Sequence, residues 1–266
     1  MLLVTDLDGT LLTSRKIIGP RTRQALADYR QRGGQLAACS ARPVSSMMQL
    51  LQEQEVDTLF SWCAGFNGGQ ILAMAQQRII HSAGLSSQQL QDIDRHSVLS
   101  RYSHHFFSAG AIYCRDDYPV ARWTRYEARL FDLPLIAAPF ENIVNRNDIY
   151  KITLVADSSK IDSLDAQLNI ILPVDYRATV TGAHYIDIQR AEINKGYAIK
   201  TLIEQAGICA AQVIAFGDQQ NDVSMFTAAG VGIAMGNAPA SVKKQADYVT
   251  ASNDDEGIAD ALKWLR

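Results

Sequence analysis

The sequence lacks an excess of positive charge and any long hydrophobic run. Its 266 residues include 25 Lys+Arg and 28 Asp+Glu, a formal net charge of -3. This balance argues against a nucleic-acid partner, because binding to a phosphate backbone needs surplus cationic charge. No apolar run reaches the roughly 18 residues of a membrane span, and Asp6 interrupts the apolar start that a signal peptide would need. We therefore expect a cytoplasmic protein with no membrane partner.

Cysteine is scarce as well. The four cysteines are too widely spaced for a CxxC metal or redox pair. A chain of this length does not need disulfides, so we expect reduced thiols. What is present is a composition of 47% hydrophobic and 20% charged residues, which is typical of a soluble globular protein. The length allows one large domain or a core with a smaller companion.

Short apolar segments alternate with amphipathic helical patterns at both ends of the chain. Strand patterns at Leu2–Thr5 and Gln35–Cys39 are separated by a helical pattern that begins at Pro20. This alternation predicts an α/β fold with a doubly wound, Rossmann-like parallel sheet. From about 84 to 184 the pattern changes to an α+β module, whose last strand we expect at Ile171–Tyr176. We therefore predict a discontinuous core, 1–83 and 185–266, with an inserted cap domain, 84–184.

An acidic pair follows the first predicted strand. Asp6 and Asp8 lie at its carboxyl end, where open α/β sheets place their active sites. Gly9 permits an unusual backbone angle, so both carboxylates can converge on one ligand. Two adjacent acids repel each other unless a cation lies between them, and hard oxygen ligands suit Mg²⁺. The alternative is a turn with solvated acids.

A second acidic cluster, Gly217–Asp222, follows the apolar strand pattern Val213–Phe216. Carboxyl ends of neighbouring parallel strands meet at one sheet edge, so Asp218 and Asp222 are expected to form a Mg²⁺ site with Asp6. Asp222 can also cap the helix that follows.

Two further polar residues lie at helix starts. Ser40 follows the second strand pattern and Lys195 begins a helix after the insertion. Hydroxyls and helix amides bind phosphate oxygens, and an ammonium group offsets their charge. Either residue alone would more often be a solvated surface group.

The four elements resemble the haloacid dehalogenase superfamily of phosphohydrolases in their order along the chain, which is Asp6–Thr10, Ser40, Lys195 and Gly217–Asp222. Asn67-Gly68 and the segments 194–196 and 234–238 look like its Cof-type subfamily (subclass IIB), which carries an α/β cap between the second and third motifs. The resemblance implies a Mg²⁺-dependent phosphatase for small phosphorylated metabolites, most often sugar phosphates. One departure is Ala41, where the family usually has glycine; its methyl group restricts the backbone.

The resemblance also implies a role for each site residue. Asp6 would be the nucleophile that forms an aspartyl-phosphate, and Asp8 the general acid and base. Mg²⁺ would be held by Asp6, the Asp8 carbonyl and Asp218, with Asp222 in support. Phosphate would be held by the Leu7 backbone, Ser40, the Ala41 amide, Lys195 and Asn221.

Two other functions stay open at this point. A phosphomutase would share the aspartyl-phosphate but return the phosphoryl group to a sugar. A non-catalytic protein would bind Mg²⁺ and a phosphorylated metabolite without turnover. In each case the expected partner is a small phosphorylated metabolite, and the expected assembly is a monomer or a weak homo-oligomer. We expect the cap to select the leaving group, because the core motifs contact only phosphate and Mg²⁺.

Overall fold

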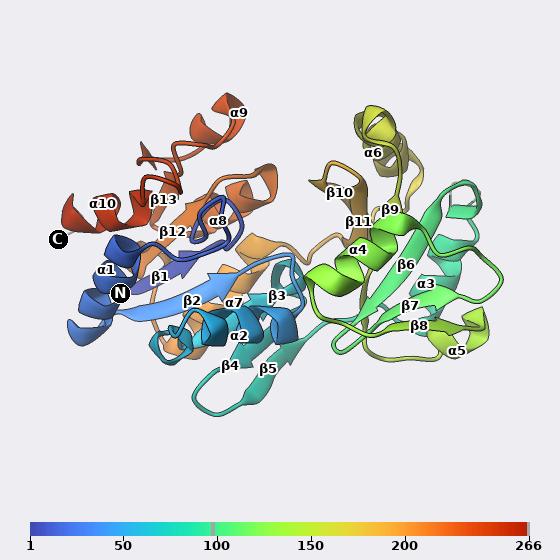
Figure 1. The fold of residues 1–266 in the computed structure, drawn as a ribbon, viewed down its shortest axis with the longest axis horizontal. Helices are drawn as coiled ribbons and strands as arrows, with labels where there is room; N and C mark the ends of the chain where they lie inside the picture. The colour runs from blue at the N-terminus through green and yellow to red at the C-terminus, as the bar shows by residue number, and fades with distance from the viewer. Residues whose placement is uncertain (97–98, 265–266) are drawn as a thin grey trace. The chain divides into compact units, whose positions relative to one another are not determined.

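The computed structural model describes residues 1–96 and 99–264. The chain divides into two compact units, a core unit, Met1–His81 with Asn194–Arg266, and an inserted unit, Ser82–Ile193 (Figure 1). The sequence placed the second boundary after His184. The structure places it after Ile193, because β11 (Tyr185–Arg190) pairs with β9 (Ile149–Val155) of the inserted unit.

The core sheet has the strand order β14-β13-β12-β1-β2-β3-β4-β5. From β14 to β3 all neighbours are parallel, and β4 is antiparallel to β3. β1 therefore lies inside the sheet, between strands from the two ends of the chain. The strands are β1 (Leu2–Thr5), β2 (Gln35–Cys39), β3 (Trp62–Gly65), β4 (Gln70–Ala73), β5 (Arg78–Ser82), β12 (Val213–Gly217), β13 (Val231–Ala234) and β14 (Tyr248–Val249).

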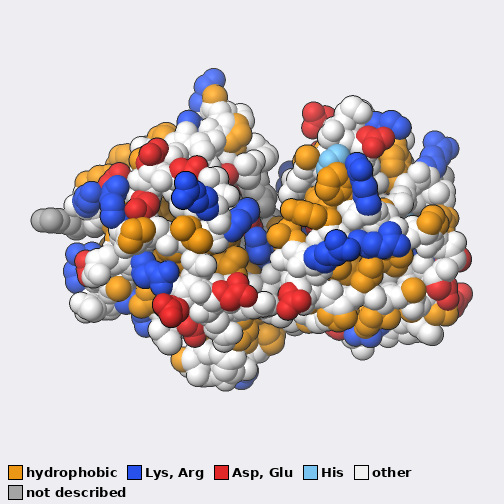
Figure 2. Space-filling view, in the orientation of Figure 1, with side chains coloured by type: hydrophobic (Ala, Val, Ile, Leu, Met, Phe, Trp, Pro, Cys, Tyr) orange, Lys and Arg blue, Asp and Glu red, His pale blue; other side chains and the backbone are white. Residues whose placement is uncertain are grey.

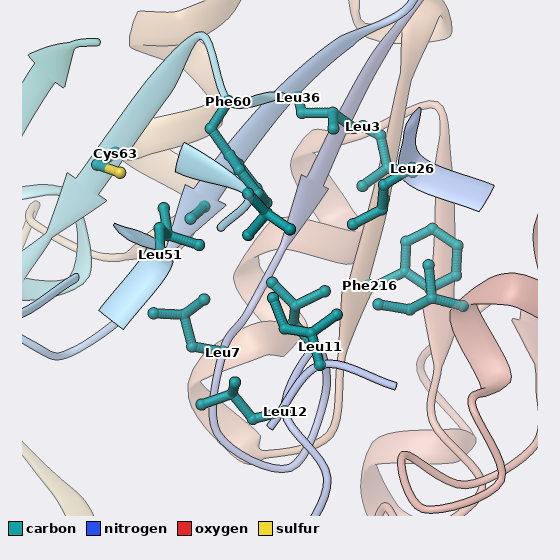
Figure 3. Packing of buried hydrophobic residues seen from close by; sticks show 14 of the residues in the cluster. Leu3, Leu7, Leu11, Leu12, Leu26, Leu36, Leu51, Phe60, Cys63 and Phe216 are labelled. Atoms are coloured by element: carbon teal, nitrogen blue, oxygen red, sulfur yellow. The ribbon is translucent and has the colours of Figure 1, made fainter. Parts of the chain in front are cut away.

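Both faces of this sheet are covered by helices. Leu3 points to a hydrophobic cluster that includes Leu26 of α1 and Ile258 of α10, part of which Figure 3 shows. Leu2 and Val4 belong to a second cluster on the other face. The predicted doubly wound core with an inserted α+β unit is confirmed. The core helices are α1 (Pro20–Gln31), α2 (Val44–Glu53), α7 (Lys195–Ala206), α8 (Val223–Ala228), α9 (Ala240–Lys243) and α10 (Gly257–Trp264).

Helix α7 has clear start and stop signals. The side chain of Asn194 accepts a hydrogen bond from the Tyr197 amide at 3.0 Å, so it caps the first turn. The helix ends at Gly207, whose φ of 64° is the left-handed conformation that glycine adopts without strain. The cap fixes Lys195 as the first helical residue.

The inserted unit is a sheet of order β10-β11-β9-β6-β7-β8 with helices. The strand predicted at Ile171–Tyr176 is wrong. Helix α6 continues to Ile171, because Leu164 and Leu168 are buried at helical spacing, and β10 begins only at Tyr176. The remaining elements are β6 (Ser103–Ser108), β7 (Ile112–Arg115), β8 (Leu135–Ala138), β10 (Tyr176–Gly182), α3 (Ser87–Asp94), α4 (Arg122–Leu130), α5 (Phe140–Val144) and α6 (Ile161–Ile171).

Short 3-10 helices connect several of these elements: η1 (Asp57–Leu59), η2 (Phe66–Gly68), η3 (Leu99–Arg101), η4 (Ser158–Lys160), η5 (Ala210–Gln212) and η6 (Gln220–Asp222). Within the described part of the chain, no helix is both long and apolar enough to cross a membrane.

The visible faces of both units carry charges of both signs among apolar side chains (Figure 2). Helix α4 is an exception, because its exposed arginines Arg122, Arg125 and Arg129 recur at helical spacing along one side. A band of Lys and Arg side chains is visible there in Figure 2.

Candidate active site

The carboxyl ends of β1 and β12 bring three aspartates together. The two strands pair in parallel with Thr5 opposite Phe216, so the residues that follow them leave the sheet at the same edge. Carboxylate oxygens of Asp6, Asp218 and Asp222 lie within 4.8 Å of one another, and all three residues are buried. Neighbouring strand ends thus gather charges that are more than 200 residues apart in the sequence.

Lys195 lies within this carboxylate cluster. Its Nζ donates to Oδ1 of Asp6 and to Oδ1 of Asp222, both at 2.6 Å, and its side chain is 1% exposed. Burial by itself would lower the pKa of Lys195, but Asp222 and Asp6 outweigh it and hold the pKa above its usual value. The cluster therefore contains a permanent cation.

Asp222 also binds its own loop. Its Oδ2 accepts hydrogen bonds from the backbone amides of Asp218 and Gln219, both at 2.8 Å. The prediction that Asp222 caps the helix that follows it is wrong for its side chain: Asp222 precedes α8 but makes no side-chain hydrogen bond to that helix, and its carboxylate instead holds the loop before it. Thr10 Oγ1 donates to Oδ1 of Asp218 at 2.7 Å, which orients this carboxylate as well. Two of the three carboxylates are therefore held by the backbone or a hydroxyl.

Asp6 is the least restrained of the three. Its Oδ1 accepts from Lys195, whereas its Oδ2 has no hydrogen-bond partner among residues 1–96 and 99–264. Burial raises the pKa of Asp6 to about 8, against the attraction of Lys195, and Asp222 and Asp218 raise it further. Burial also raises the pKa of Asp218. Asp6 thus presents one uncommitted oxygen from a site that disfavours its ionised form.

The side chain of Asp8 has different partners. Arg42 donates from Nε to Oδ2 at 2.6 Å and from Nη2 to Oδ1 at 2.8 Å, and Lys16 Nζ donates to Oδ1 at 2.7 Å. Burial would raise the pKa of Asp8, but its hydrogen bonds and charge interactions with Arg42 and Lys16 outweigh burial and lower the pKa to about 2. The sequence predicted neither contact with Asp8, although Arg42 follows directly after Ser40 and Ala41.

Two glycines allow the loops to approach. Gly9 has a φ of 79°, and a Cβ there would lie 2.4 Å from Oδ2 of Asp218. At Gly217 a Cβ would lie 2.3 Å from Cβ of Asp222. The Gly9 carbonyl also accepts a hydrogen bond from Asn237 Nδ2 at 2.9 Å. A larger residue at either position would displace a carboxylate of the cluster.

Four of the predicted phosphate-binding residues, Leu7, Ser40, Ala41 and Asn221, follow the neighbouring parallel strands β1, β2 and β12, and Lys195 begins helix α7. Ser40 follows β2, which pairs in parallel with β1, and its hydroxyl accepts from the Arg42 amide at 3.3 Å. Within the described ranges, the amides of Leu7 and Ala41 donate no hydrogen bond. Both amides are thus available to an anionic ligand.

The side chain of Asn221 is hydrogen-bonded to Asn67, a residue to which the sequence analysis assigned no role in the site. Its Nδ2 donates to Oδ1 of Asn67 at 3.3 Å. Asn67 is buried and has a φ of 56°, the left-handed conformation that asparagine tolerates better than most residues. In the sequence, only the Asn-Gly pair at 67–68, which is typical of a turn, indicated this conformation.

The carboxylate cluster suits a hard divalent cation. Its donors are all carboxylate oxygens, which Mg²⁺ prefers, and three acids face a single ammonium group. A divalent ion would offset the remaining negative charge. Asp6, Asp218 and Asp222 are the side chains that could hold it.

A family model described as haloacid dehalogenase-like hydrolase matches residues 3–262. A phosphatase from Bacillus subtilis is 27% identical, and the match covers 99% of this chain and 99% of that protein. A 5-amino-6-(5-phospho-D-ribitylamino)uracil phosphatase from the same species is 26% identical, covering 98% and 96%. A solved haloacid dehalogenase-like hydrolase from Bacteroides thetaiotaomicron has a TM-score of 0.85 at 27% identity, covering 100% of this chain and 99% of the other.

The matches extend over nearly the whole chain and include both the core and the inserted unit. They confirm the resemblance to Cof-type haloacid dehalogenase phosphatases that the order of the motifs indicated. This chain belongs to the haloacid dehalogenase-like hydrolase family, as a phosphoric monoester hydrolase.

Proposed function

We propose that the chain is a Mg²⁺-dependent phosphatase that hydrolyses small phosphorylated metabolites through an aspartyl-phosphate on Asp6. One observation carries the proposal: Asp6 presents an uncommitted Oδ2 inside a buried cluster with two further carboxylates and Lys195. An enzymatic nucleophile needs a free atom and a neighbouring cation that reduces the repulsion of an anionic substrate.

The proposed reaction has two steps. Oδ2 of Asp6 attacks phosphorus, the bond to the leaving oxygen breaks, and the protonated form of Asp8 gives that oxygen a proton. Because Arg42 and Lys16 hold the pKa of Asp8 at about 2 in the free protein, Asp8 takes up this proton when the substrate binds. Water then attacks the aspartyl-phosphate while Asp8 takes up a proton, which releases inorganic phosphate and restores Asp6. When bound by Asp6, the Asp8 carbonyl, Asp218 and Asp222, Mg²⁺ would supply positive charge to the phosphate oxygens.

The remaining predicted residues bind the phosphate in this proposal. Lys195 would pair with a phosphate oxygen, because its Nζ already lies beside the nucleophile. The hydroxyl of Ser40, the amides of Leu7 and Ala41 and the side chain of Asn221 would donate to the others. In this proposal these groups contact only the phosphate, so they do not distinguish one leaving group from another.

We propose sugar phosphates as the principal substrates. The B. subtilis relative that covers the same span acts, by its name, on a phosphorylated ribityl chain, which is a phosphate ester of a polyol. The exposed arginine row of α4 gives the inserted unit a local positive charge that suits anionic substrates. Selection of the leaving group is assigned to the inserted unit. We also propose a cytoplasmic location and a monomer or weak homo-oligomer.

The proposal is tested with a panel of phosphorylated sugars and cofactors, each assayed for phosphate release with Mg²⁺ and with EDTA. We expect release from several sugar phosphates and its loss in EDTA, restored by added Mg²⁺. Isomerised sugar phosphate without phosphate release would identify a phosphomutase instead. Binding without any turnover across the panel would identify a non-catalytic protein.

Metal binding should appear in the pH dependence of stability. The pKa of Asp6 is about 8 in the fold against an ordinary value of 3.8, so the folded state binds more protons between these values. Stability of the metal-free protein should therefore fall as pH rises from about 5 to about 8. Asp8 does not contribute in this window, because its stabilisation is lost only as pH falls from 3.8 towards about 2.

Mg²⁺ favours ionised carboxylates, so the rise in Tm on adding Mg²⁺ should be larger near pH 8 than near pH 5. Thermal melts at both pH values, with and without the ion, measure this. The Asp6→Asn variant serves as the control, because it should flatten the metal-free profile. An equal response to Mg²⁺ at both pH values would contradict the assignment.

A further inference from the structure

Asp8 is held by a fork of hydrogen bonds from Arg42. The Nε and Nη2 atoms of Arg42 contact the two oxygens of the Asp8 carboxylate at 2.6 and 2.8 Å, and the Arg42 side chain is only 8% exposed. A planar guanidinium that binds both oxygens fixes the plane of a carboxylate as well as its position. A lysine or a single hydrogen bond would leave that plane free to rotate.

A second cation reaches the same carboxylate from solvent. Lys16 Nζ lies 2.7 Å from Oδ1 of Asp8, and the Lys16 side chain is 57% exposed. Lys16 lies in a turn closed by hydrogen bonds between Thr13 and Ile17. Exposed ion pairs contribute little because solvent screens them. Arg42 therefore dominates the orientation of Asp8, and Lys16 is the weaker partner.

Arg42 commits one edge of its guanidinium, Nε with Nη2, to the two oxygens of Asp8. This is one of the two edges on which a guanidinium can bind an oxyanion with two parallel hydrogen bonds. The Arg42 backbone, by contrast, shapes the predicted phosphate loop, since the Arg42 amide donates to Ser40 Oγ at 3.3 Å. The side chain and the backbone thus serve different parts of the site.

We propose that Arg42 is a positioning residue: its guanidinium sets the orientation of Asp8, with Lys16 as a weaker second contact. The inference rests on the proposed function, in which Asp8 transfers protons at the leaving oxygen. Proton transfer requires the carboxyl group within hydrogen-bond reach and correctly aimed. Arg42 acts on the reaction only through Asp8.

A double-mutant cycle tests this. Wild type, Arg42→Met, Asp8→Ala and the double variant are assayed with p-nitrophenyl phosphate and phenyl phosphate. We expect Arg42→Met to lower kcat by about 10–100-fold, as loss of a supporting contact commonly does. The loss should be larger with phenyl phosphate, whose leaving group needs a proton more. KM and the inhibition constant for inorganic phosphate should change less than about threefold.

In the Asp8→Ala background the Arg42 substitution should have no further effect on kcat, because residues that act as a unit are not additive. Lys16→Met should cost less than Arg42→Met. Arg42→Lys, which keeps a cation without the fork, should give an intermediate kcat and provides the test if Arg42→Met does not fold. Arg146→Met is the matched control, since Arg146 makes the same two-bond fork with Asp148 at 2.8 Å in the inserted unit.

Other outcomes would contradict the positioning role of Arg42 or the function on which it rests. A full Arg42 effect that persists in the Asp8→Ala background, or a raised KM with kcat preserved, would overturn the positioning role while leaving the proposed function intact. A larger loss in Lys16→Met than in Arg42→Met would overturn the ranking on which the role rests. No turnover by wild type on either substrate would overturn the proposed function, and this inference with it.

Discussion

Asp6→Asn is expected to reduce phosphatase turnover by about 10⁴-fold or more while the fold survives. The amide keeps the size and an oxygen for Lys195 Nζ but cannot act as the nucleophile. The substitution also removes one of three buried, mutually repelling acids, and Asp222 remains as a partner of Lys195. The thermal stability of the metal-free variant near pH 8 should therefore equal or exceed that of wild type.

Steady-state phosphate release and mass spectrometry of quenched reactions measure the effect. Wild type should carry a phosphoryl adduct on the peptide that contains Asp6, and the variant should not. Asp28→Asn is the matched control, because Asp28 lies on α1 and accepts a hydrogen bond from Gln24 outside the site. Substantial phosphatase activity in purified Asp6→Asn protein would refute the nucleophile assignment.

Lys195→Met should damage both activity and stability. Methionine is unbranched and fills the space of the lysine stem as far as Cε, but it leaves Asp6 and Asp222 without the ammonium group that lies 2.6 Å from each. Removing one partner of a buried ion pair costs about 3–5 kcal/mol in the free energy of unfolding. Turnover should fall by about 10³-fold, since the cation beside the nucleophile is lost.

The cost of Lys195→Met should be larger near pH 8 than near pH 5, because Asp6, with a pKa of about 8 in the wild-type fold, can be protonated at the lower pH. Chemical denaturation at both pH values, without metal, measures this. Lys200→Met on the exposed side of α7 is the control, since Lys200 is exposed on the same helix. Wild-type stability of Lys195→Met near pH 8 would show that the carboxylates do not depend on this cation.

The cluster of Asp6, Asp218 and Asp222 was predictable because strand periodicity places both acidic motifs at carboxyl ends of parallel strands. That argument uses only backbone topology. Lys195 was predictable as a helix start, but its two ion pairs were not, since a sequence does not tell in which direction a long side chain extends. The family resemblance supplied the individual roles.

Three features of the structure were not predicted from the sequence, and each depends on geometry that a sequence pattern does not encode. Lys16 lies in an irregular turn without helix or strand periodicity, so its contact with Asp8 could not be predicted from the sequence. Asn67 adopts a left-handed conformation that brings it to Asn221, and local sequence indicates only a turn there. In the inserted unit, the apolar run that ends α6 resembles a strand because short apolar runs fit both structures.

The position of β1 bears on how the protein forms during synthesis. One neighbour, β2, leaves the ribosome soon after β1, whereas the other, β12, pairs Leu2 with Val213 and comes after the whole inserted unit. Until then the nascent chain holds an open apolar strand edge, the kind of surface that chaperones cover. The inserted unit has its own hydrophobic cluster and can fold in that interval. Asp6 meets Asp218 only at the end, so an incomplete chain carries no competent site.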